Sequence, residues 1–503
     1  MKRFLTVLPV SMGMVSVAVV LFAAPGAASG SPYGAELSHG PPVSSGTAVA
    51  IPVQEAPTIS VPRGSLGTPL LERLRSLLGL LVIGGIAWAL SLDRGRISWR
   101  VVGWGVALQM GFAVFILKTP LGAGVFDAAG RVVVALLGFT MSGAQFVFGN
   151  LVYATVPVGT GVVGQGDFSA LPGQVAQTGA VIAFNVLPTI IFFSALMTVL
   201  YHLGIMQVAV RGMAWVMQRT MGTSGAETLS AAGNVFVGQT EAPLLIKPFV
   251  DKMTMSELMA VMTGGFATVA GGVMAAYVGM LISYFPDIAG HLIAASVMSA
   301  PAALVIAKIM VPEDGVPETA ESAGIVVERP DVNVIDAAAR GASEGLFLAL
   351  NVGAMLLAFI ALIHLCNGML GWAGGLVGFG DLTFESILGF LLAPLAWLMG
   401  VPWVDAPTVA SLMGVKTILN EFVAYLQLAG TLGGDHQLQP RSIIIATYAL
   451  SGFANFASIA VQIGGIGGIA PGRRHDLSRL GLRAMVGGSL AAFMTATVAG
   501  VIL

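Results

Sequence analysis

The chain has 503 residues, of which 56% are hydrophobic and only 10% are charged, and it contains 66 glycines. Soluble domains carry roughly 25% charged residues, so this composition excludes an ordinary soluble protein and indicates an integral membrane protein. Apolar runs of about 18 to 25 residues recur and predict several membrane-spanning helices. The net charge of −2 predicts no nucleic-acid partner, and the single cysteine excludes a disulfide framework or a cysteine metal site.

The N-terminal 70 residues differ from the rest of the chain. Residues 1–28 combine Lys2 and Arg3 with an apolar run and the small-residue segment APGAASG, which predicts a signal peptide cleaved near Ala28. An uncleaved first membrane helix is the alternative. Residues 29–70 are rich in Ser, Gly and Pro, and we expect a disordered exported linker.

Residues 71–155 are expected to form N-terminal scaffold helices. Spans are predicted over 77–92 and 101–117, and the three arginines between them place that loop in the cytoplasm. Residues 126–151 fit an interfacial or tilted helix as well as a full span. The loop over 157–173, rich in Gly and Pro, is then expected outside.

A first repeat is predicted over 175–312. Its spans are expected over 175–203, 257–281 and 292–310. The segment 223–249 is interrupted by Gly and Pro and predicts a reentrant hairpin, while GGFATVAGG predicts a break in the 257–281 helix. An acidic cytoplasmic linker over 313–334 would follow.

A second repeat is predicted over 335–503, in the opposite orientation. Spans are expected over 346–370, 442–465 and 484–503, with an apolar helix over 384–400 and a second reentrant hairpin over 407–428. The arginine-rich loop 471–483 is expected inside and the C-terminus outside. The predicted fold is therefore an all-α polytopic membrane protein with about eight transmembrane helices, two reentrant hairpins in inverted repeats, and interfacial helices.

Polar residues inside the apolar segments predict a binding site. A carboxylate at membrane depth costs about 3 kcal/mol on insertion scales, so Glu241 and Glu421 need partners, either structural ones or a hydroxyl-rich ligand. Gln239 and Thr240 offer amide and hydroxyl groups to a planar polar ring, and Asn455 and Ser458 can share one helix face.

A cation site is a second prediction. Hairpin tips and broken helices leave backbone carbonyls free, and with Asn234 and Thr268 these carbonyls would form an oxygen cage for a small hard cation.

Four motifs in order, GNVFVGQTEAPLLIKPF, GGFATVAGG, NEFVAY and SGFANFASIAVQIGGIGGIAP, resemble the concentrative nucleoside transporter family over about residues 75–503. The resemblance implies a homotrimer with one nucleoside site in each protomer. It implies base contacts from Gln239 and Thr240 with Glu241 lining the site, ribose contacts from Glu421, Asn455 and Ser458, and apolar walls from Val273 and Phe453. The family's sodium ligands map onto Asn234, Val237, Thr268 and Val269, with Thr268 at a position that is often Ser in relatives.

We therefore expect a multi-pass transporter of the bacterial inner membrane that imports nucleosides by cation symport and is not an enzyme. Sodium is the expected coupling ion, with the proton as alternative, and no cofactor is expected. A passive facilitator and a membrane enzyme with Glu241 and Glu421 as an acid/base pair are the weaker alternatives. Purine and pyrimidine nucleosides both remain open as substrates.

Overall fold

The computed structural model describes most of the chain beyond its N-terminal region, and the signal peptide and nearly all of the exported linker lie outside the described residues. The described residues are 67–153, 155–161, 168–177, 182–320, 331–376, 378–379, 382–434 and 438–503. Among the described residues two units are present, the smaller one between residues 153 and 177 and the larger one within 67–152 and 182–503.

The smaller unit contains a β-hairpin where a loop was predicted. Strands β1 (Thr155–Gly161) and β2 (Phe168–Gln177) pair antiparallel, with an irregularity between Pro157 and Gly159. Proline has no N–H to donate to the ladder, which explains the irregularity. The described residues of the predicted loop 157–173 therefore belong to strands, and the following span does not begin at residue 175, where β2 still continues. The Thr and Val residues of β1 favour a strand more than the Gly and Pro content suggested.

The larger unit begins with helices that were predicted in outline. They are α2 (Leu70–Ala89), η1 (Arg94–Arg96), α3 (Trp99–Lys118), α4 (Pro120–Phe148) and η2 (Gly149–Val152). Thr119 caps α4 through a hydrogen bond from the Gly122 amide, and Pro120 occupies its first position. Helix α4 is long and apolar enough to span a membrane, which favours the full-span alternative.

The next elements include the first hairpin and the first broken helix. In order they are the π-helical η3 (Ile182–Val186), α5 (Leu187–His202), α6 (Ile205–Met221), α7 (Gly225–Gly233), η4 (Ala242–Ile246), α8 (Lys247–Val250), α9 (Met255–Ala267), α10 (Gly271–Leu281) and α11 (Ile288–Met310). We call Gly225–Val250 hairpin 1. The predicted break falls at residues 268–270, between α9 and α10.

The remaining elements contain a second hairpin and a second broken helix. They are α12 (Val334–Gly375), α13 (Phe384–Leu398), α14 (Ala406–Ile418), α15 (Glu421–Leu432), α16 (Pro440–Leu450), α17 (Phe456–Ile469), η5 (Pro471–Arg473) and α18 (Arg474–Ile502). We call Ala406–Leu432 hairpin 2. The residues predicted as the loop 471–483 are instead η5 and the first turns of α18, where the Arg473 guanidinium bonds the Asp476 carboxylate at 2.8 Å.

Seven described helices, with broken or kinked ones counted once, are long and apolar enough to cross a membrane. Six of them match predicted spans and the seventh is α4. Of the other two predicted spans, one is α2 and the other is divided between α16 and α17 by the break at 451–455. The fold is thus the all-α polytopic membrane protein that the sequence predicted.

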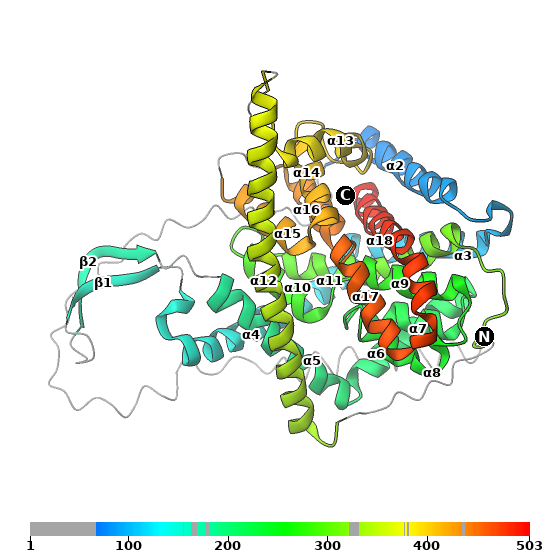
Figure 1. Cartoon of the computed structure of the whole chain (residues 1–503), viewed down its shortest axis with the longest axis horizontal. Helices are drawn as coiled ribbons and strands as arrows, with labels where there is room; N and C mark the ends of the chain where they lie inside the picture. Colours follow the sequence, from blue (N-terminus) through cyan, green and yellow to red (C-terminus); the bar gives the residue numbers. More distant parts are fainter. Residues whose placement is uncertain are drawn as a thin grey trace. The chain divides into compact units, whose positions relative to one another are not determined.

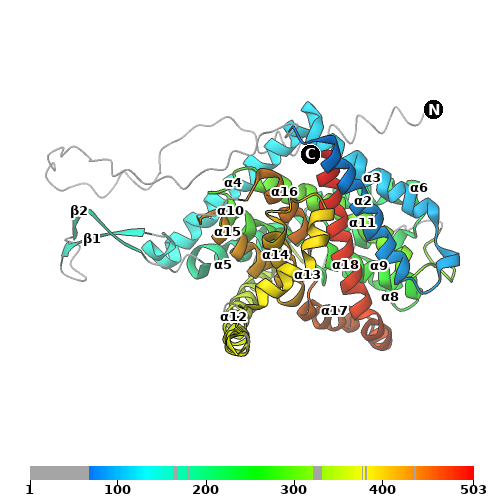
Figure 2. The ribbon, with the colours of Figure 1, turned by 90° about the horizontal axis from the view of Figure 1, so that it is seen from above.

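The core of the larger unit lies among α9, α11 and α18, which pack on one another. Figure 1 shows α12 as the long yellow helix, and in the perpendicular view of Figure 2 it is seen end-on. Helix α12 packs along α5, and α10 contacts α5 and α15. Most of the residues of α9 and α11 are buried, whereas α12 is largely exposed.

Candidate functional site

Hairpin 2 presents Glu421 at the start of a helix. Helix α14 ends at Ile418, and Asn420 takes an extended conformation in which its Oδ1 accepts a 2.9 Å hydrogen bond from the Val423 amide. This cap begins α15 at Glu421. The carboxylate therefore lies at the positive end of the helix dipole, which stabilises its charge.

Two side chains from other elements hold the Glu421 carboxylate. The Tyr277 hydroxyl of α10 donates to Oε1 at 2.9 Å, and the Asn455 Nδ2 donates to Oε2 at 3.0 Å. Glu421 is only 5% exposed. Both carboxylate oxygens are thus hydrogen-bonded, as a buried charge requires.

Asn455 joins hairpin 2 to the second broken helix. Its Oδ1 accepts from the Ser458 amide at 2.9 Å and caps α17, while its Nδ2 contacts Glu421. Gly452 in the same break has φ +123°, and a Cβ there would lie 2.8 Å from the carbonyl oxygens of Phe266 and Ala267. A glycine is therefore required for the two helix breaks to approach each other.

The tip of hairpin 1 meets α17 through Gln239. The Gln239 Nε2 donates to the Ser458 Oγ at 3.3 Å, and its Oε1 accepts from the Gln462 Nε2 at 3.0 Å. Gln462 also donates to the Met262 carbonyl of α9 at 3.1 Å. One hydrogen-bonded network therefore joins hairpin 1, α9 and α17.

Glycines allow this close approach. A Cβ on Gly265 would lie 2.7 Å from the Gln462 Nε2, and one on Gly465 would lie 2.7 Å from the Thr240 Cγ2. Such distances are shorter than a methyl group tolerates, so the tip of hairpin 1 is fitted against glycine surfaces of α9 and α17.

Glu241 lies in a different environment from Glu421. Its Oε2 accepts from the Gly238 amide at 3.0 Å and closes the turn at the tip, and the residue is exposed. The sequence reasoning treated the two carboxylates as equivalent, whereas the structure buries only Glu421. The difference arises because Glu421 begins a packed helix and Glu241 lies in a turn.

The predicted cation ligands include an unpaired amide. Asn234 is 1% exposed, and neither its Oδ1 nor its Nδ2 has a hydrogen-bond partner among the described residues. A Cβ on Gly264 would lie 3.4 Å from the Asn234 Nδ2, and the Thr268 Oγ1 donates to the Gly264 carbonyl at 2.9 Å. Asn234 and Thr268 therefore border the same residue of α9.

The other predicted residues lie in the same core. Val273 on α10 is buried and Phe453 is half-buried in the second break, while the Val237 and Val269 backbones belong to the hairpin tip and the first break. The Gly271 amide, just after that break, donates to the Phe236 carbonyl at 3.1 Å. This bond ties the break in the first broken helix to the tip of hairpin 1.

Sequence reasoning missed three residues of this region: Tyr277, Gln462 and Lys416. Lys416 on α14 is fully buried, and its Nζ donates to the Ala449 carbonyl at the end of α16 at 2.9 Å. Gln462 and Lys416 are strongly polar side chains within apolar runs, and this is the signal that could have identified them. Gln462 also follows Ser458 by one helical turn.

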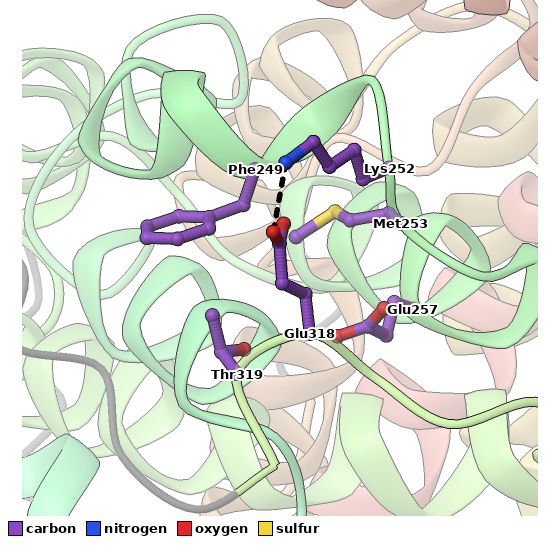
Figure 3. Close-up of a pocket in the computed structure, with 6 residues that line it drawn as sticks. All are labelled: Phe249, Lys252, Met253, Glu257, Glu318 and Thr319. Carbon is purple, nitrogen blue, oxygen red and sulfur yellow. Dashed lines mark hydrogen bonds and ion pairs between the residues drawn. The ribbon is translucent and has the colours of Figure 1, made fainter.

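A second polar region lies at the base of hairpin 1. Figure 3 shows a pocket there, where the Lys252 ammonium contacts the Glu318 carboxylate at 2.8 Å with Phe249 and Thr319 beside them. The hydrogen bond to Glu318 raises the pKa of Lys252. The Thr319 hydroxyl accepts from the Ala226 amide at 3.0 Å and so caps α7.

Three family models match the chain. Residues 78–151 match the Na+ dependent nucleoside transporter N-terminus, residues 183–284 the nucleoside recognition Gate domain, and residues 291–500 the Na+ dependent nucleoside transporter C-terminus. The matches include both hairpins and both broken helices. The β-hairpin falls between the first and second of them.

Relatives and solved structures agree with these matches. An uncharacterized transporter of Haemophilus influenzae is 45% identical, with 86% of this chain and 98% of that protein aligned. Sodium/nucleoside cotransporter 1 of Mus musculus is 41% identical over 86% of this chain, which spans 64% of that protein's length. The structure of CNTnw in an inward-facing substrate-bound state has a TM-score of 0.74 and 42% identity, with 85% of this chain and 97% of that chain covered. The chain belongs to the concentrative nucleoside transporter family.

Proposed function

We propose that this protein imports nucleosides across a bacterial inner membrane by cation symport, with sodium as the coupling ion. The observation that carries the proposal is the buried, hydrogen-bonded set of residues Gln239, Ser458, Asn455 and Glu421, in which the Ser458 hydroxyl accepts from Gln239 and its backbone amide donates to Asn455. A polar assembly at membrane depth is costly unless it serves a polar ligand or ion. The family matches give the ligand class.

The proposed roles follow the chemistry of each group. Glu421 accepts hydrogen bonds from ribose hydroxyls, and Asn455 and Ser458 complete the sugar contacts. The base is met by Gln239, Thr240 and Glu241. Val273 and Phe453 form the apolar walls.

Sodium is proposed to bind at Asn234 and Thr268 with the carbonyls of Val237 and Val269. The support is the buried, unpaired amide of Asn234 beside Gly264. An amide oxygen left without a partner costs about 1–3 kcal/mol, which a bound cation would recover. Since Gly271 bonds Phe236, an ion at this position would also stiffen the hairpin tip.

Transport is proposed to follow alternating access in a homotrimer. Moving one unit charge across 100 mV supplies about 2.3 kcal/mol, enough for roughly fifty-fold accumulation. Coupling to an ion therefore explains how a nucleoside could be concentrated. Proton coupling would move the coupling group from the Asn234 site to a carboxylate.

The test is uptake of radiolabelled uridine and adenosine into proteoliposomes with an inward sodium gradient, an inward proton gradient, or neither. We expect accumulation above equilibrium only with sodium. Accumulation only with the proton gradient would mean that the coupling ion is the proton and not sodium. Equilibration without accumulation under all three conditions would indicate a facilitator, and no uptake beyond protein-free vesicles would reject nucleoside transport.

A further inference from the structure

Gln462 lies one helical turn beyond Ser458 on α17 and is fully buried. Its single nitrogen, Nε2, contacts two oxygens: the Met262 carbonyl at 3.1 Å and the Gln239 Oε1 at 3.0 Å. Gln462 therefore contacts both α9 and hairpin 1 through this one atom.

The Met262 carbonyl fixes the orientation of both amides. A backbone carbonyl can only accept, so the Gln462 atom that faces it must be the amino nitrogen. The same nitrogen faces Gln239, and the Gln239 atom opposite a donor must be its oxygen. The orientation of both amides therefore follows from which groups can donate and which can accept.

The orientation of Gln239 determines what a ligand meets. Its oxygen is directed toward Gln462, and its amino group is directed toward Ser458 at 3.3 Å. An amide nitrogen has two hydrogens, so one N–H remains for a ligand after the bond to Ser458. Gly265 allows this arrangement because a side chain there would meet both glutamines.

We propose that Gln462 is a positioning residue that sets the orientation of the Gln239 amide, so that an N–H donor meets the edge of a bound nucleobase. This inference rests on the proposed function. An N–H donor requires an acceptor on the base, and a 4-oxo or 6-oxo group supplies one whereas the amino group at that position supplies a donor. The protein then prefers uridine over cytidine and inosine over adenosine at the contacted edge.

The variant Gln462→Glu reverses the orientation. A buried carboxyl with no cation beside it stays protonated, and its one proton is needed by the Met262 carbonyl. The oxygen that replaces Nε2 can then only accept from Gln239. The Gln239 amide turns over, and its oxygen faces Ser458 and the ligand.

The experiment measures kcat/KM for uridine and cytidine, and for inosine and adenosine, in proteoliposomes of wild-type protein and Gln462→Glu. We expect the oxo-to-amino ratio to fall by about tenfold or more in both pairs, since the reversed amide presents an acceptor, which leaves an oxo group unpaired and pairs an amino group. A ratio that is unchanged in Gln462→Glu would overturn the inference. Wild-type protein that takes up none of the four would reject the proposed function instead.

Two further variants keep the test decisive. Gln218→Glu makes the same substitution on α6, in a half-buried position outside the site, and should keep the wild-type ratio. If Gln462→Glu does not fold, Gln462→Met removes the contact without a carboxyl and leaves the Gln239 amide free to turn. Its oxo-to-amino ratio should approach one, and a wild-type ratio in that variant would equally overturn the inference.

Discussion

Replacing Lys308 with methionine should destabilise the protein much more than replacing an exposed lysine. The Lys308 ammonium, near the end of α11, lies 2.7 Å from the Glu227 carboxylate and 2.9 Å from the Glu313 carboxylate, and it donates to the Ser256 hydroxyl at 3.0 Å. The Lys308 side chain is 7% exposed and that of Glu227 is 1% exposed. This cluster joins α11, hairpin 1 and α9.

The magnitude follows from the burial of Glu227. Removing Lys308 leaves that carboxylate buried without its cation, and breaking a buried pair in this way costs about 3–5 kcal/mol. The unfolding entropy grows with chain length, and for 503 residues each kcal/mol of lost unfolding free energy lowers the melting temperature by about 1 °C. We therefore expect Lys308→Met to lower the melting temperature of the purified protein in detergent by about 3–5 °C.

The chain offers a matched control. Lys252 forms an ion pair of similar length, 2.8 Å to Glu318, but the two side chains are 67% and 45% exposed. Exposed pairs contribute about 0–1 kcal/mol, so Lys252→Met should shift the melting temperature by less than about 1 °C. The double variant Lys308→Met with Glu227→Gln should recover part of the loss because it removes the unpaired charge. Equal shifts for the two lysine variants, or no recovery in the double variant, would refute this reasoning.

Two further predictions concern the glycines of α17 and the acidic segment before α12. Gly465→Ala should lower kcat/KM for nucleoside uptake by about tenfold, because the new methyl displaces the tip of hairpin 1; Gly464→Ala, with open space at its Cβ position, is the control and should behave as wild type. The Arg340 guanidinium, at 2.6 and 2.9 Å, lowers the pKa of the Asp331 carboxyl from its usual 3.8. Because the pKa of Asp331 is lowered, the ion pair stabilises the folded protein fully at pH values above the usual pKa. This stabilisation is lost as the pH falls through the lowered pKa. The melting-temperature difference between wild type and Asp331→Asn should thus be constant from about pH 8 to pH 5 and disappear only in stronger acid, and a difference that changes near neutral pH would contradict it.

Local signals in the sequence were sufficient for most of the helices. Apolar length predicted α3 and α11 within a few residues, and the glycine-rich segment predicted the break between α9 and α10. These features depend on short-range backbone preferences and on length, which a sequence displays directly. The β-hairpin was missed because Pro157, Gly159 and Gly161 interrupt the short first strand and are typical of a loop.

The polar contacts were predicted only in part. Asn455 and Ser458 were predicted to share a helix face, but Asn455 precedes α17 in an extended conformation and caps it by accepting from the Ser458 amide. The contact between Gln239 and Gln462 joins residues 223 positions apart, and no local pattern encodes it. The same holds for Tyr277 and Glu421, 144 positions apart. Each of these residues could be suspected as polar in an apolar run, but its partner came only from the fold.

The hydrogen bonds of the site form a continuous line between the two halves of the first broken helix. It runs from the Met262 carbonyl of α9 through Gln462, Gln239 and Ser458, then through Asn455 and Glu421 to Tyr277 on α10.

The longest link in this line is the 3.3 Å contact between Gln239 and Ser458, which exceeds the usual N–H···O distance. It is also the longer of two links between hairpin 1 and α17, the other being the 3.0 Å bond from Gln462 to Gln239, so a ligand would replace it at the least cost. Because most of the other groups are already paired, a nucleoside bound at the proposed site would mainly exchange hydrogen bonds there. Discrimination between ligands would then depend on whether each ligand group matches the protein group that it faces, donor against acceptor. The total number of hydrogen bonds that the ligand can form would matter less.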